Sequence, residues 1–392
     1  MAAPRALLAL AAMSGLLLAC SSPAQTPAPS ATTPAPTMAA TAAPAPMADP
    51  AAPACGDGPA LLASMTTRDK LAQLLMVGVT GAADAKAVVE NHHVGGIFIG
   101  SWTDLSMLSD GTIASIAETG PLPLAVSVDE EGGRVSRLEP LIGNQPSPRV
   151  LAAGHTPDEV YNIALARGQA MRKLGITIDF APVVDVTNAP DDTVIGDRSF
   201  GADPTAVTDY AGAYARGLRD AGLLPVLKHF PGHGHGSGDT HTGSVVTPPL
   251  ADLQAGDLIP YRTLTTQGPV GVMVGHIEVP GLTGSDPASL SPAAYALLRS
   301  GDYGGPGFNG PVFTDDLSSM QAISDRMGVA EAALRGLQAG ADIALWVTTD
   351  EVPAVLDRLE KALAAGELTM PRVDASVLRM AAVKGPNQRC GR

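Results

Sequence analysis

Short, almost entirely apolar stretches recur along the chain from about residue 58 onward, and longer amphipathic stretches separate them. Nearly continuous hydrophobicity over about six residues is typical of parallel strands that are buried on both faces of a sheet. The pattern therefore predicts eight strands, at residues 73–79, 95–100, 123–129, 175–181, 223–228, 270–276, 310–315 and 341–347.

The amphipathic stretches between these strands predict helices, among them 158–173, 205–221, 250–267, 291–300, 327–339 and 351–365. Thr156-Pro157 precedes the helix at 158–173, and Ser291-Pro292 starts the helix at 291–300, which is a common pattern at a helix start. Eight strand–helix units in about 300 residues predict an α/β fold, a (β/α)8 barrel of the TIM type. A doubly wound open sheet is the alternative, but the glycine-rich phosphate turn that usually follows its first strand is missing from the sequence. We expect one folded domain, residues 55–392, and no second domain.

The N-terminus has the pattern of an export signal. Arg5 precedes an apolar run over residues 6–19, which is shorter than the roughly twenty residues that a membrane-spanning helix needs. The run ends Leu-Leu-Ala before Cys20, which resembles the lipobox of bacterial lipoproteins and implies a signal peptide at 1–19 and lipidation of Cys20. The alternative is an ordinary secretory signal with an incidental cysteine. Both interpretations export the protein, and the first anchors it to the cell membrane with its folded domain outside the cytoplasm.

Residues 20–54 have the composition of a tether, because they are dominated by Ser, Thr, Pro and Ala and show no apolar periodicity. Such a composition cannot bury a core and predicts a disordered linker. Cys55 and Cys390 are the other two cysteines, and in an oxidising compartment they are candidates for a disulfide bond. Two free thiols on mobile ends are the alternative.

The charge balance of the chain indicates which classes of partner are disfavoured. The chain has 25 basic and 39 acidic residues, and no basic run interrupts the acidic excess. This balance argues against nucleic acid as a partner. We expect a monomer whose contact with the membrane is the lipid anchor.

Polar residues follow several of the predicted strands at the point where each strand ends. Asp129 ends the third strand, Lys228 and His229 the fifth, His276 the sixth and Asp315 the seventh. Catalytic residues of (β/α)8 barrels lie at the carboxyl ends of strands drawn from different parts of the chain. The sequence therefore predicts an active site at this end of the barrel.

The stretch 228–241, KHFPGHGHGSGDTH, is a loop that carries four histidines among glycines and a proline. Loops on a rigid scaffold are common places for catalytic groups. In an extended segment, Asp239 and His241 point the same way, so the carboxylate can orient the imidazole by a hydrogen bond. A histidine oriented in this way suits general acid–base catalysis near neutral pH.

Taken together, the motifs of the chain resemble those of the family 3 glycoside hydrolases, in particular the β-N-acetylglucosaminidases that trim peptidoglycan fragments. The resemblance covers residues 60–385. It rests on VDEEGGRVSRL (128–138), DFAPVVDV (179–186), IGDRSFG (195–201), KHFPGHG with DTH (228–241), PASLSP (287–292) and FTDDLSSM (313–320).

The resemblance implies a role for individual residues. Asp315 matches the nucleophile of the T-D-D-L motif, His241 matches the proton donor and acceptor, and Asp239 matches its partner. Residues that hold the sugar are implied at Asp129, Arg137, Arg198, Lys228 and His229. The resemblance implies no cofactor and no metal. The sequence departs from the family pattern at Thr240, Glu130 and Asp179, where Ser, Gln and Asn are more frequent.

These roles imply a retaining β-N-acetylhexosaminidase that acts by double displacement on carbohydrate containing N-acetylglucosamine. Phosphorolysis is an alternative, because a neutral histidine would tolerate phosphate in place of water as the acceptor. A non-catalytic lipoprotein that binds wall fragments is a second alternative.

Several residues also have simpler interpretations. The histidine-rich loop could hold zinc, although its spacing lacks the helical pattern of known zinc motifs. Asp316 is expected to cap the following turn. Glu130 and Glu131 are adjacent and should point to opposite faces, which disfavours a joint catalytic role. His276 is left outside the catalytic set.

Overall fold

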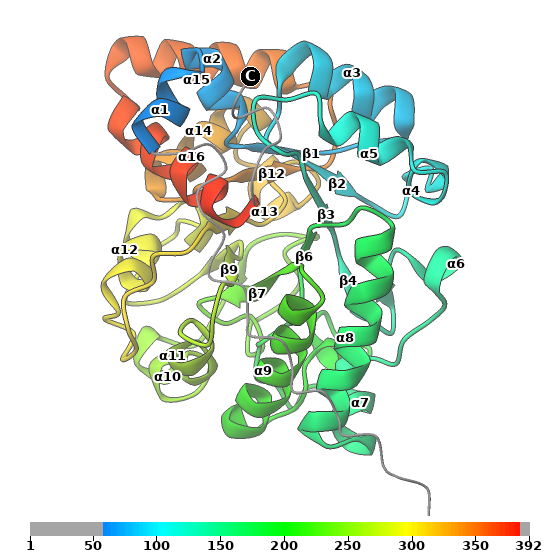
Figure 1. The fold of residues 1–392 in the computed structure, drawn as a ribbon. Helices are drawn as coiled ribbons and strands as arrows, with labels where there is room; N and C mark the ends of the chain where they lie inside the picture. Colours follow the sequence, from blue (N-terminus) through cyan, green and yellow to red (C-terminus); the bar gives the residue numbers. More distant parts are fainter. Residues whose placement is uncertain (1–57, 385–392) are drawn as a thin grey trace, which may run out of the picture. The chain divides into compact units, whose positions relative to one another are not determined.

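The computed structural model describes residues 58–384 (Figure 1). The predicted signal peptide, the linker and Cys20, Cys55 and Cys390 lie outside the described residues, so lipidation and the disulfide stay predictions.

Eight parallel strands form the centre of the fold, and each overlaps one of the predicted strands. They are β1 (Leu75–Gly78), β2 (Gly96–Ile99), β3 (Ala125–Val128), β6 (Ile178–Asp179), β7 (Leu224–Phe230), β9 (Gly271–Val274), β11 (Val312–Thr314) and β12 (Ala344–Trp346). Their order in the sheet is β11-β9-β7-β6-β3-β2-β1-β12. A parallel bridge between Phe313 and Ile343 brings the two ends of this sheet together. The prediction of a TIM-type barrel is confirmed.

Helices cover the outside of the barrel between successive strands (Figure 1). They are α3 (Ala82–His92), α4 (Ser106–Ser109), α5 (Thr112–Ala117), α8 (Pro157–Lys173), α9 (Pro204–Asp220), α10 (Leu250–Ala255), α11 (Ile259–Leu264), α12 (Pro292–Ser300), α14 (Val329–Ala339) and α15 (Val352–Ala365). The capping box predicted for α8 is present, because Thr156 and Glu159 exchange side-chain and backbone hydrogen bonds. The helix α12 begins at Pro292 without a side-chain cap from Ser291.

The prediction of one helix over 250–267 was wrong. The segment forms two short helices, α10 and α11, and Gly256 between them has non-helical dihedral angles (φ −135°, ψ −82°). Glycine lowers helix stability, and Pro260 cannot donate its backbone nitrogen to a continuing helix. Hydrophobic periodicity alone does not reveal such a break.

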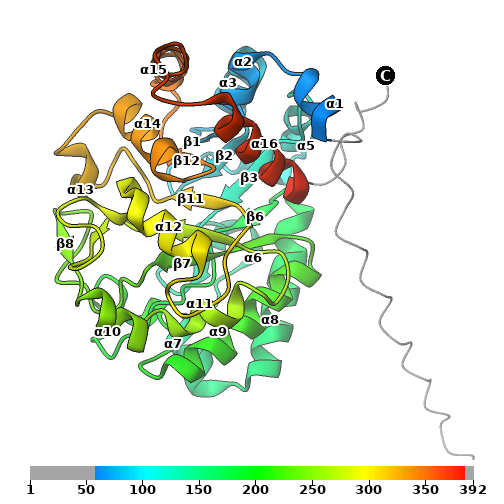
Figure 2. The same cartoon turned by 90° about the vertical axis from the view of Figure 1, so that its left-hand side faces the viewer.

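Two layers of apolar side chains hold the barrel together. One lies inside it and includes Met76, Phe98, Phe180 and Phe313, while a larger one lies between strands and helices. The terminal helix α16 (Met370–Lys384), which the sequence analysis did not predict, adds Met380 to the inner layer. Figure 2 shows α16 on the side of the molecule away from β8. The described barrel is therefore closed at one end by a helix, which leaves the other end for the site.

Short elements within the loops complete the described chain. They are α1 (Gly58–Ala63), α2 (Thr67–Ala72), β4 (Glu130–Gly132), β5 (Val135–Ser136), α6 (Glu139–Ile142), α7 (Pro148–Gly154), η1 (Gly196–Arg198), β8 (Val245–Val246), β10 (Ile277–Glu278), η2 (Ala288–Leu290) and α13 (Gln321–Ser324). Between residues 58 and 384, no helix has both the length and the apolar character that crossing a bilayer requires.

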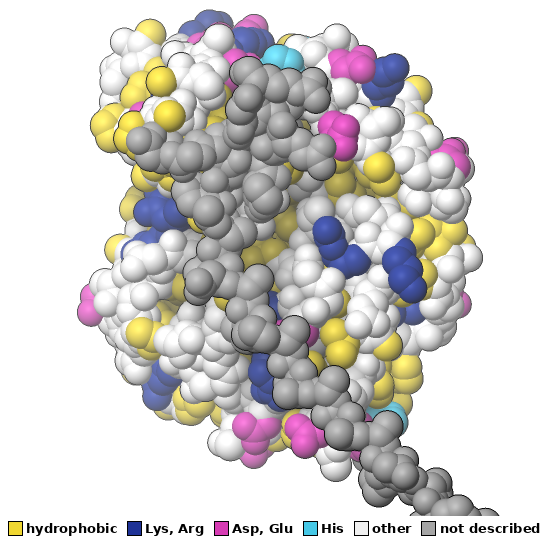
Figure 3. All heavy atoms as spheres, viewed as in Figure 1, with side chains coloured by type: hydrophobic (Ala, Val, Ile, Leu, Met, Phe, Trp, Pro, Cys, Tyr) yellow, Lys and Arg dark blue, Asp and Glu magenta, His cyan; other side chains and the backbone are white. Residues whose placement is uncertain are grey.

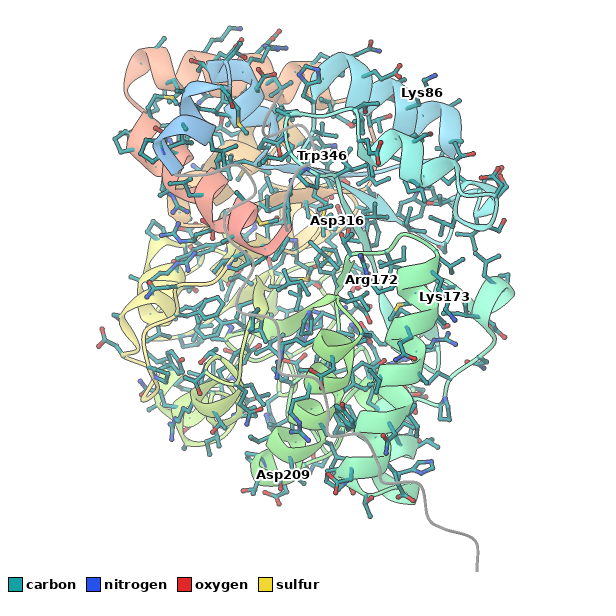
Figure 4. The ribbon with its side chains drawn as sticks, in the orientation of Figure 1. Lys86, Arg172, Lys173, Asp209, Asp316 and Trp346 are labelled. Atoms are coloured by element: carbon teal, nitrogen blue, oxygen red, sulfur yellow. The ribbon has the colours of Figure 1, made fainter. Side chains whose placement is uncertain are left out.

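The labelled side chains lie at different depths in the molecule. Lys86 and Asp209 lie on outer helices, whereas Asp316 and Trp346 lie in the middle of the molecule (Figure 4). On the face seen in Figure 3, charged side chains of both signs are scattered over the described surface and do not form a basic patch.

Candidate active site

A cavity of about 210 Å³ lies at the carboxyl ends of the strands. Of the residues that the sequence predicts for the site, seven line this cavity: Asp129, Arg137, Arg198, Lys228, His229, His241 and Asp315. The eighth, Asp239, lines a neighbouring cavity and contacts the site through His241. The structure thus brings the predicted residues together from four separate segments of the chain, residues 128–138, 195–201, 228–241 and 313–320.

The floor of the cavity is a network of opposite charges. Glu131 accepts two hydrogen bonds from the guanidinium of Arg198, at 2.7 and 2.8 Å. The ammonium of Lys228 lies 2.6 Å from Glu131 and 2.6 Å from Asp129. Burial alone would raise the pKa of Glu131, but the charges of Arg198 and Lys228 hold that pKa well below its ordinary value. These side chains are therefore charged and fixed before any ligand arrives.

Lys228 is the buried centre of this network. Burial alone would lower its pKa, yet Asp129 and Glu131 outweigh burial and raise the pKa of the ammonium. A cation held in this way, beside the partly exposed carboxylate of Asp129, presents both a donor and an acceptor to a hydroxyl-rich ligand. The pair is chemically suited to hold a sugar.

Glu130 and Glu131 point to opposite sides, as their adjacency predicts. Glu130 faces away from the cavity, where it pairs with Arg167 and accepts hydrogen bonds from the backbone nitrogens of Arg137 and Leu138, at 2.7 and 2.8 Å. Because the two carboxylates have different partners on different sides, they do not form a catalytic pair. Glu130 instead fixes the segment that carries Arg137 to the wall of the cavity.

Asp185 contacts residues of the site and was not singled out in the sequence analysis, although it lies inside the quoted motif 179–186. Its carboxylate lies 2.7 Å from Nδ1 of His229 and accepts the backbone nitrogen of His233, also at 2.7 Å. Burial alone would raise the pKa of Asp185, but the charge and hydrogen bond of His229 lower it overall. The only available signal was an acid in a motif next to a strand end.

His233 is a second residue that the sequence analysis left without a role. It is buried, it lines the cavity beside His229, and its Nδ1 has no hydrogen-bond partner among the described residues. Burial, together with the nearby charge of His229, lowers the pKa of His233, so its ring is neutral at neutral pH. A neutral ring with a free nitrogen can accept or donate one hydrogen bond to a bound ligand.

Asp315 follows β11 directly, so the rigid barrel sets its position. Its carboxylate accepts the backbone nitrogen of Asp316 at 2.9 Å. Burial alone would raise the pKa of Asp315, but the neighbouring His276 and His229 lower it below its ordinary value. The carboxylate is therefore ionised at neutral pH, the form that a nucleophile requires.

Asp316 and His276 support Asp315 through the backbone. Asp316 accepts hydrogen bonds from the backbone nitrogens of Ser318 and Ser319 at 2.8 and 3.1 Å, which confirms that it caps the following turn. His276 contacts the hydroxyl of Ser289 through Nδ1 and the carbonyl of Asp316 through Nε2, both at 2.6 Å. Burial lowers the pKa of His276, while the nearby carboxylates of Asp315 and Asp316 oppose that shift. Because a carbonyl oxygen can only accept, Nε2 donates to Asp316.

Asp239 and His241 form the predicted pair on the loop after β7. Oδ1 of Asp239 lies 2.7 Å from Nδ1 of His241 and also accepts the backbone nitrogen of His241 at 2.9 Å. Both side chains are substantially exposed, at 40% and 54%. Burial slightly opposes ionisation of Asp239, but its hydrogen bonds to His241 lower its pKa, so the carboxylate is charged at neutral pH. Nε2 of His241 has no hydrogen-bond partner in the described structure and is available for proton transfer.

Contacts on both sides fix the ends of this loop. His235 lies 3.1 Å from the buried carboxylate of Asp257, and Thr240 accepts the backbone nitrogen of Ala322 at 3.1 Å.

The four histidines of this loop do not converge on one point. His229, His235 and His241 each pair with a different aspartate, respectively Asp185, Asp257 and Asp239. No group of three or more His, Cys, Asp or Glu side chains within residues 58–384 is arranged to hold a metal ion. The described histidines of this loop therefore take part in separate contacts.

Comparison with known proteins identifies the family. Residues 66–383 match the model of the glycosyl hydrolase family 3 N-terminal domain. The chain is 67% identical, over the whole of both sequences, to a protein named beta-hexosaminidase LpqI from Mycobacterium tuberculosis.

The solved structures that resemble this chain indicate the same family. One is a family 3 glycosyl hydrolase from Mycobacterium smegmatis, which is 74% identical with a TM-score of 0.83 and matches 83% of this chain and 99% of its own. Another is a family 3 β-N-acetylglucosaminidase from Paenibacillus, which is 33% identical with a TM-score of 0.76 over 82% of this chain and 62% of its own. Because the family model matches most of the chain and a relative is 67% identical over its whole length, the chain belongs to glycosyl hydrolase family 3.

Proposed function

We propose that this family 3 enzyme, a β-hexosaminidase, is a retaining β-N-acetylhexosaminidase that removes terminal β-linked N-acetylglucosamine from peptidoglycan fragments or related glycans. Two relatives support this proposal: the beta-hexosaminidase that is 67% identical over the whole chain, and the Paenibacillus β-N-acetylglucosaminidase. The observation that carries the mechanism is that an ionised buried carboxylate, Asp315, and an oriented imidazole, His241, line the same cavity.

The floor of the cavity is the proposed binding site for the terminal sugar. Asp129, Arg198, Lys228 and His229 converge there with both donors and acceptors, and Arg137 lines the wall. A cavity of about 210 Å³ is smaller than the roughly 300 Å³ at which sites for drug-sized ligands begin, so it suits one sugar ring. A cavity of that size favours release of a single terminal residue.

The first chemical step forms a bond between Asp315 and the sugar. An oxygen of Asp315 attacks the anomeric carbon, while the imidazolium of His241 donates its Nε2 proton to the departing glycosidic oxygen. Asp239, ionised and bound to Nδ1, stabilises the positive charge of the protonated ring.

The second step reverses these roles. His241 takes a proton from a water molecule, the resulting hydroxide attacks the anomeric carbon, and Asp315 leaves as a carboxylate. Two inversions give net retention of the β configuration. Phosphate as the acceptor in place of water would give a sugar 1-phosphate, which the product analysis below separates from hydrolysis.

The test uses an aryl N-acetyl-β-glucosaminide and purified wall fragments, with and without phosphate. We expect free N-acetylglucosamine, released first as the β anomer in NMR spectra, and a loss of about 10⁴-fold or more in kcat for Asp315→Asn. Initial release of the α anomer, or an Asp315→Asn variant that keeps most of its activity, would reject the mechanism. Turnover by neither protein would favour the wall-binding lipoprotein.

We also propose that the enzyme is exported and anchored through Cys20, on the strength of the apolar run over residues 6–19 and the cysteine that follows it. Feeding cells an alkyne-tagged fatty acid should label the wild type and leave Cys20→Ser unlabelled. Equal labelling of both proteins would refute the anchor, and an exported but unlabelled wild type would indicate an ordinary secretory signal.

A further inference from the structure

Trp102 is a large aromatic side chain that the mechanism above does not use. It lies in the loop between β2 and α4 (Figure 1), it is 46% exposed, and it lines the same cavity as Asp315. Within residues 58–384, the other exposed large hydrophobic residues are Val150 and Val246, and neither lines that cavity. An exposed indole is costly in water, so its place at the mouth of an active site needs an explanation.

The structure holds the indole of Trp102 firmly in place. A Cβ atom on Gly100 would lie only 2.3 Å from the ring, so the indole packs directly against this glycine. Phe98 packs beside it, with ring centroids 6.1 Å apart. Thr103 fixes the loop, because its hydroxyl donates to the carbonyl of Val79 at 2.7 Å and accepts the nitrogen of Gly100 at 3.0 Å. One part of the ring is packed in this way while nearly half of the side chain faces solvent.

The cavity combines buried charged residues with one exposed aromatic residue. Its ion-paired residues Glu131, Arg198 and Lys228 are mostly buried, whereas Trp102 is 46% exposed. The other apolar residues that line it are Phe98, Val135, Val194, Ile195, Met273, Met320, Leu345 and Val347. The buried ion-paired residues can satisfy the hydroxyl groups of one sugar. The next ring of a substrate then lies nearer to solvent, where Trp102 exposes its indole.

We propose that Trp102 is the platform for the sugar on the leaving-group side of the bond that is cleaved. This proposal rests on the proposed function. The C–H face of a pyranose ring is apolar, so laying it on the indole removes apolar surface of both from water. Binding energy from this remote ring would help to hold the glycosidic bond against Asp315 and His241. Trp102 thereby makes the enzyme prefer glycans in which N-acetylglucosamine is linked to another sugar.

The kinetic test compares a substrate that has a second sugar with one that has none. The β-1,4-linked disaccharide of N-acetylglucosamine supplies the second ring, and N-acetyl-β-glucosaminyl fluoride lacks it. For Trp102→Ala we expect the ratio of kcat/KM for the disaccharide to kcat/KM for the fluoride to fall about tenfold. Trp102→Phe should recover part of the loss, and Val150→Ala, a matched change of an exposed apolar residue on α7, should leave the ratio at its wild-type value.

An equal fall for both substrates would overturn the proposal, because it would place Trp102 against the terminal sugar itself. An unchanged ratio would overturn it as well. If wild-type enzyme turned over neither substrate, the proposed function would fail, and a binding measurement would still test Trp102.

That binding measurement uses fluorescence. The chain has two tryptophans, and Trp346 is fully buried, so Trp102 is the one whose emission a surface ligand can change. In the Asp315→Asn background, the disaccharide should shift the emission much more than N-acetylglucosamine alone does. Adding Trp102→Phe should abolish the shift. A shift of equal size with the monosaccharide, or one that survives Trp102→Phe, would contradict the proposal.

Discussion

Two aspartate–histidine pairs on either side of the same glycine-rich loop have the same contact and different surroundings. In each pair, an aspartate oxygen lies 2.7 Å from the Nδ1 of the histidine. The side chains of Asp185 and His229 are 0% and 8% exposed, whereas those of Asp239 and His241 are 40% and 54% exposed. The hydrogen bond alone therefore does not distinguish a structural pair from a catalytic one.

The surroundings make the difference. Asp185 also accepts two backbone nitrogens, those of His229 at 3.3 Å and His233 at 2.7 Å, so it fixes the backbone at the start of the loop. Asp239 accepts only the backbone nitrogen of its own partner and leaves His241 free to face a ligand. We interpret the buried pair as the support of the loop and the exposed pair as the acid–base machinery. Four variants test this assignment of a supporting role to one pair and an acid–base role to the other.

The largest effect is expected when the buried pair is broken. Asp185→Ala removes the charge opposite His229 and leaves two buried backbone nitrogens without an acceptor, which should lower the free energy of unfolding by about 3–5 kcal/mol. Asp239→Ala, the same change in the exposed pair, should lower it by less than about 0.5 kcal/mol. Urea denaturation measures both values. Equal losses would mean that burial does not separate the two pairs.

The pH dependence of the stability difference between wild type and Asp185→Ala also has an expected direction. The pKa of Asp185 is lowered in the folded state, so its contribution is present above the unfolded pKa of about 3.9 and is lost as the pH falls through the folded value. The difference in stability between wild type and Asp185→Ala should therefore shrink in acid. A difference that grew in acid would contradict the assignment.

The next effect concerns rate. His241→Ala should lower kcat by about 10²–10⁴-fold on the disaccharide, whose leaving group needs a proton. The same variant should lose much less on N-acetyl-β-glucosaminyl fluoride, since fluoride leaves without one. Steady-state kinetics on the two substrates provide the comparison. Losses of the same size on both would argue against His241 as the acid.

A further variant compares two buried aspartates of the barrel, Asp179 and Asp315. Asp179 accepts the backbone nitrogen of Glu130 at 3.0 Å, and its Oδ2 has no hydrogen-bond partner among the described residues. Burial raises the pKa of Asp179 well above its ordinary value, in contrast to Asp315. A raised folded pKa stabilises the protein at low pH, and this contribution is lost as the pH rises through that value.

Asp179→Asn keeps the shape of the side chain and cannot ionise. We expect stability close to that of the wild type at pH 4 and a gain over the wild type that widens toward pH 8, measured as the shift in melting temperature. A variant that is less stable at pH 8 would show that Asp179 is needed as a charged group.

The smallest effect is expected from the third pair, His235 and Asp257. His235 is 42% exposed and does not line the cavity, so it serves to hold the loop. His235→Asn should lower kcat about threefold, in keeping with the 0–1 kcal/mol typical of partly exposed pairs. A loss as large as that of His241→Ala would instead indicate a second proton-transfer pair.

Much of this fold follows from local sequence, because strands buried on both faces must be apolar along their whole length. All eight strands were predicted for that reason, and the acids and bases at their ends were predicted with them. The break at Gly256 was missed, since it does not interrupt the periodic pattern of residues 250–267. The helix α16 was missed, since it does not extend a strong periodic pattern.

The parts of the site that sequence reasoning missed depend on contacts between distant segments. Asp185 matters because it lies against His229, 44 residues later in the chain. Trp102 matters because the barrel brings the loop after β2 to the same cavity as Asp315. A single sequence does not record which side chains meet across a barrel mouth, so the structure was needed to find them.

The central claim is that the carboxylate of Asp315 becomes bonded to the sugar. A fluorinated N-acetylglucosamine analogue with a good leaving group, which forms the intermediate faster than water releases it, allows this bond to be trapped and located by peptide mass spectrometry. The account predicts one added sugar per protein molecule, attached to Asp315. A label on another residue, or an active preparation that never becomes labelled, would contradict it.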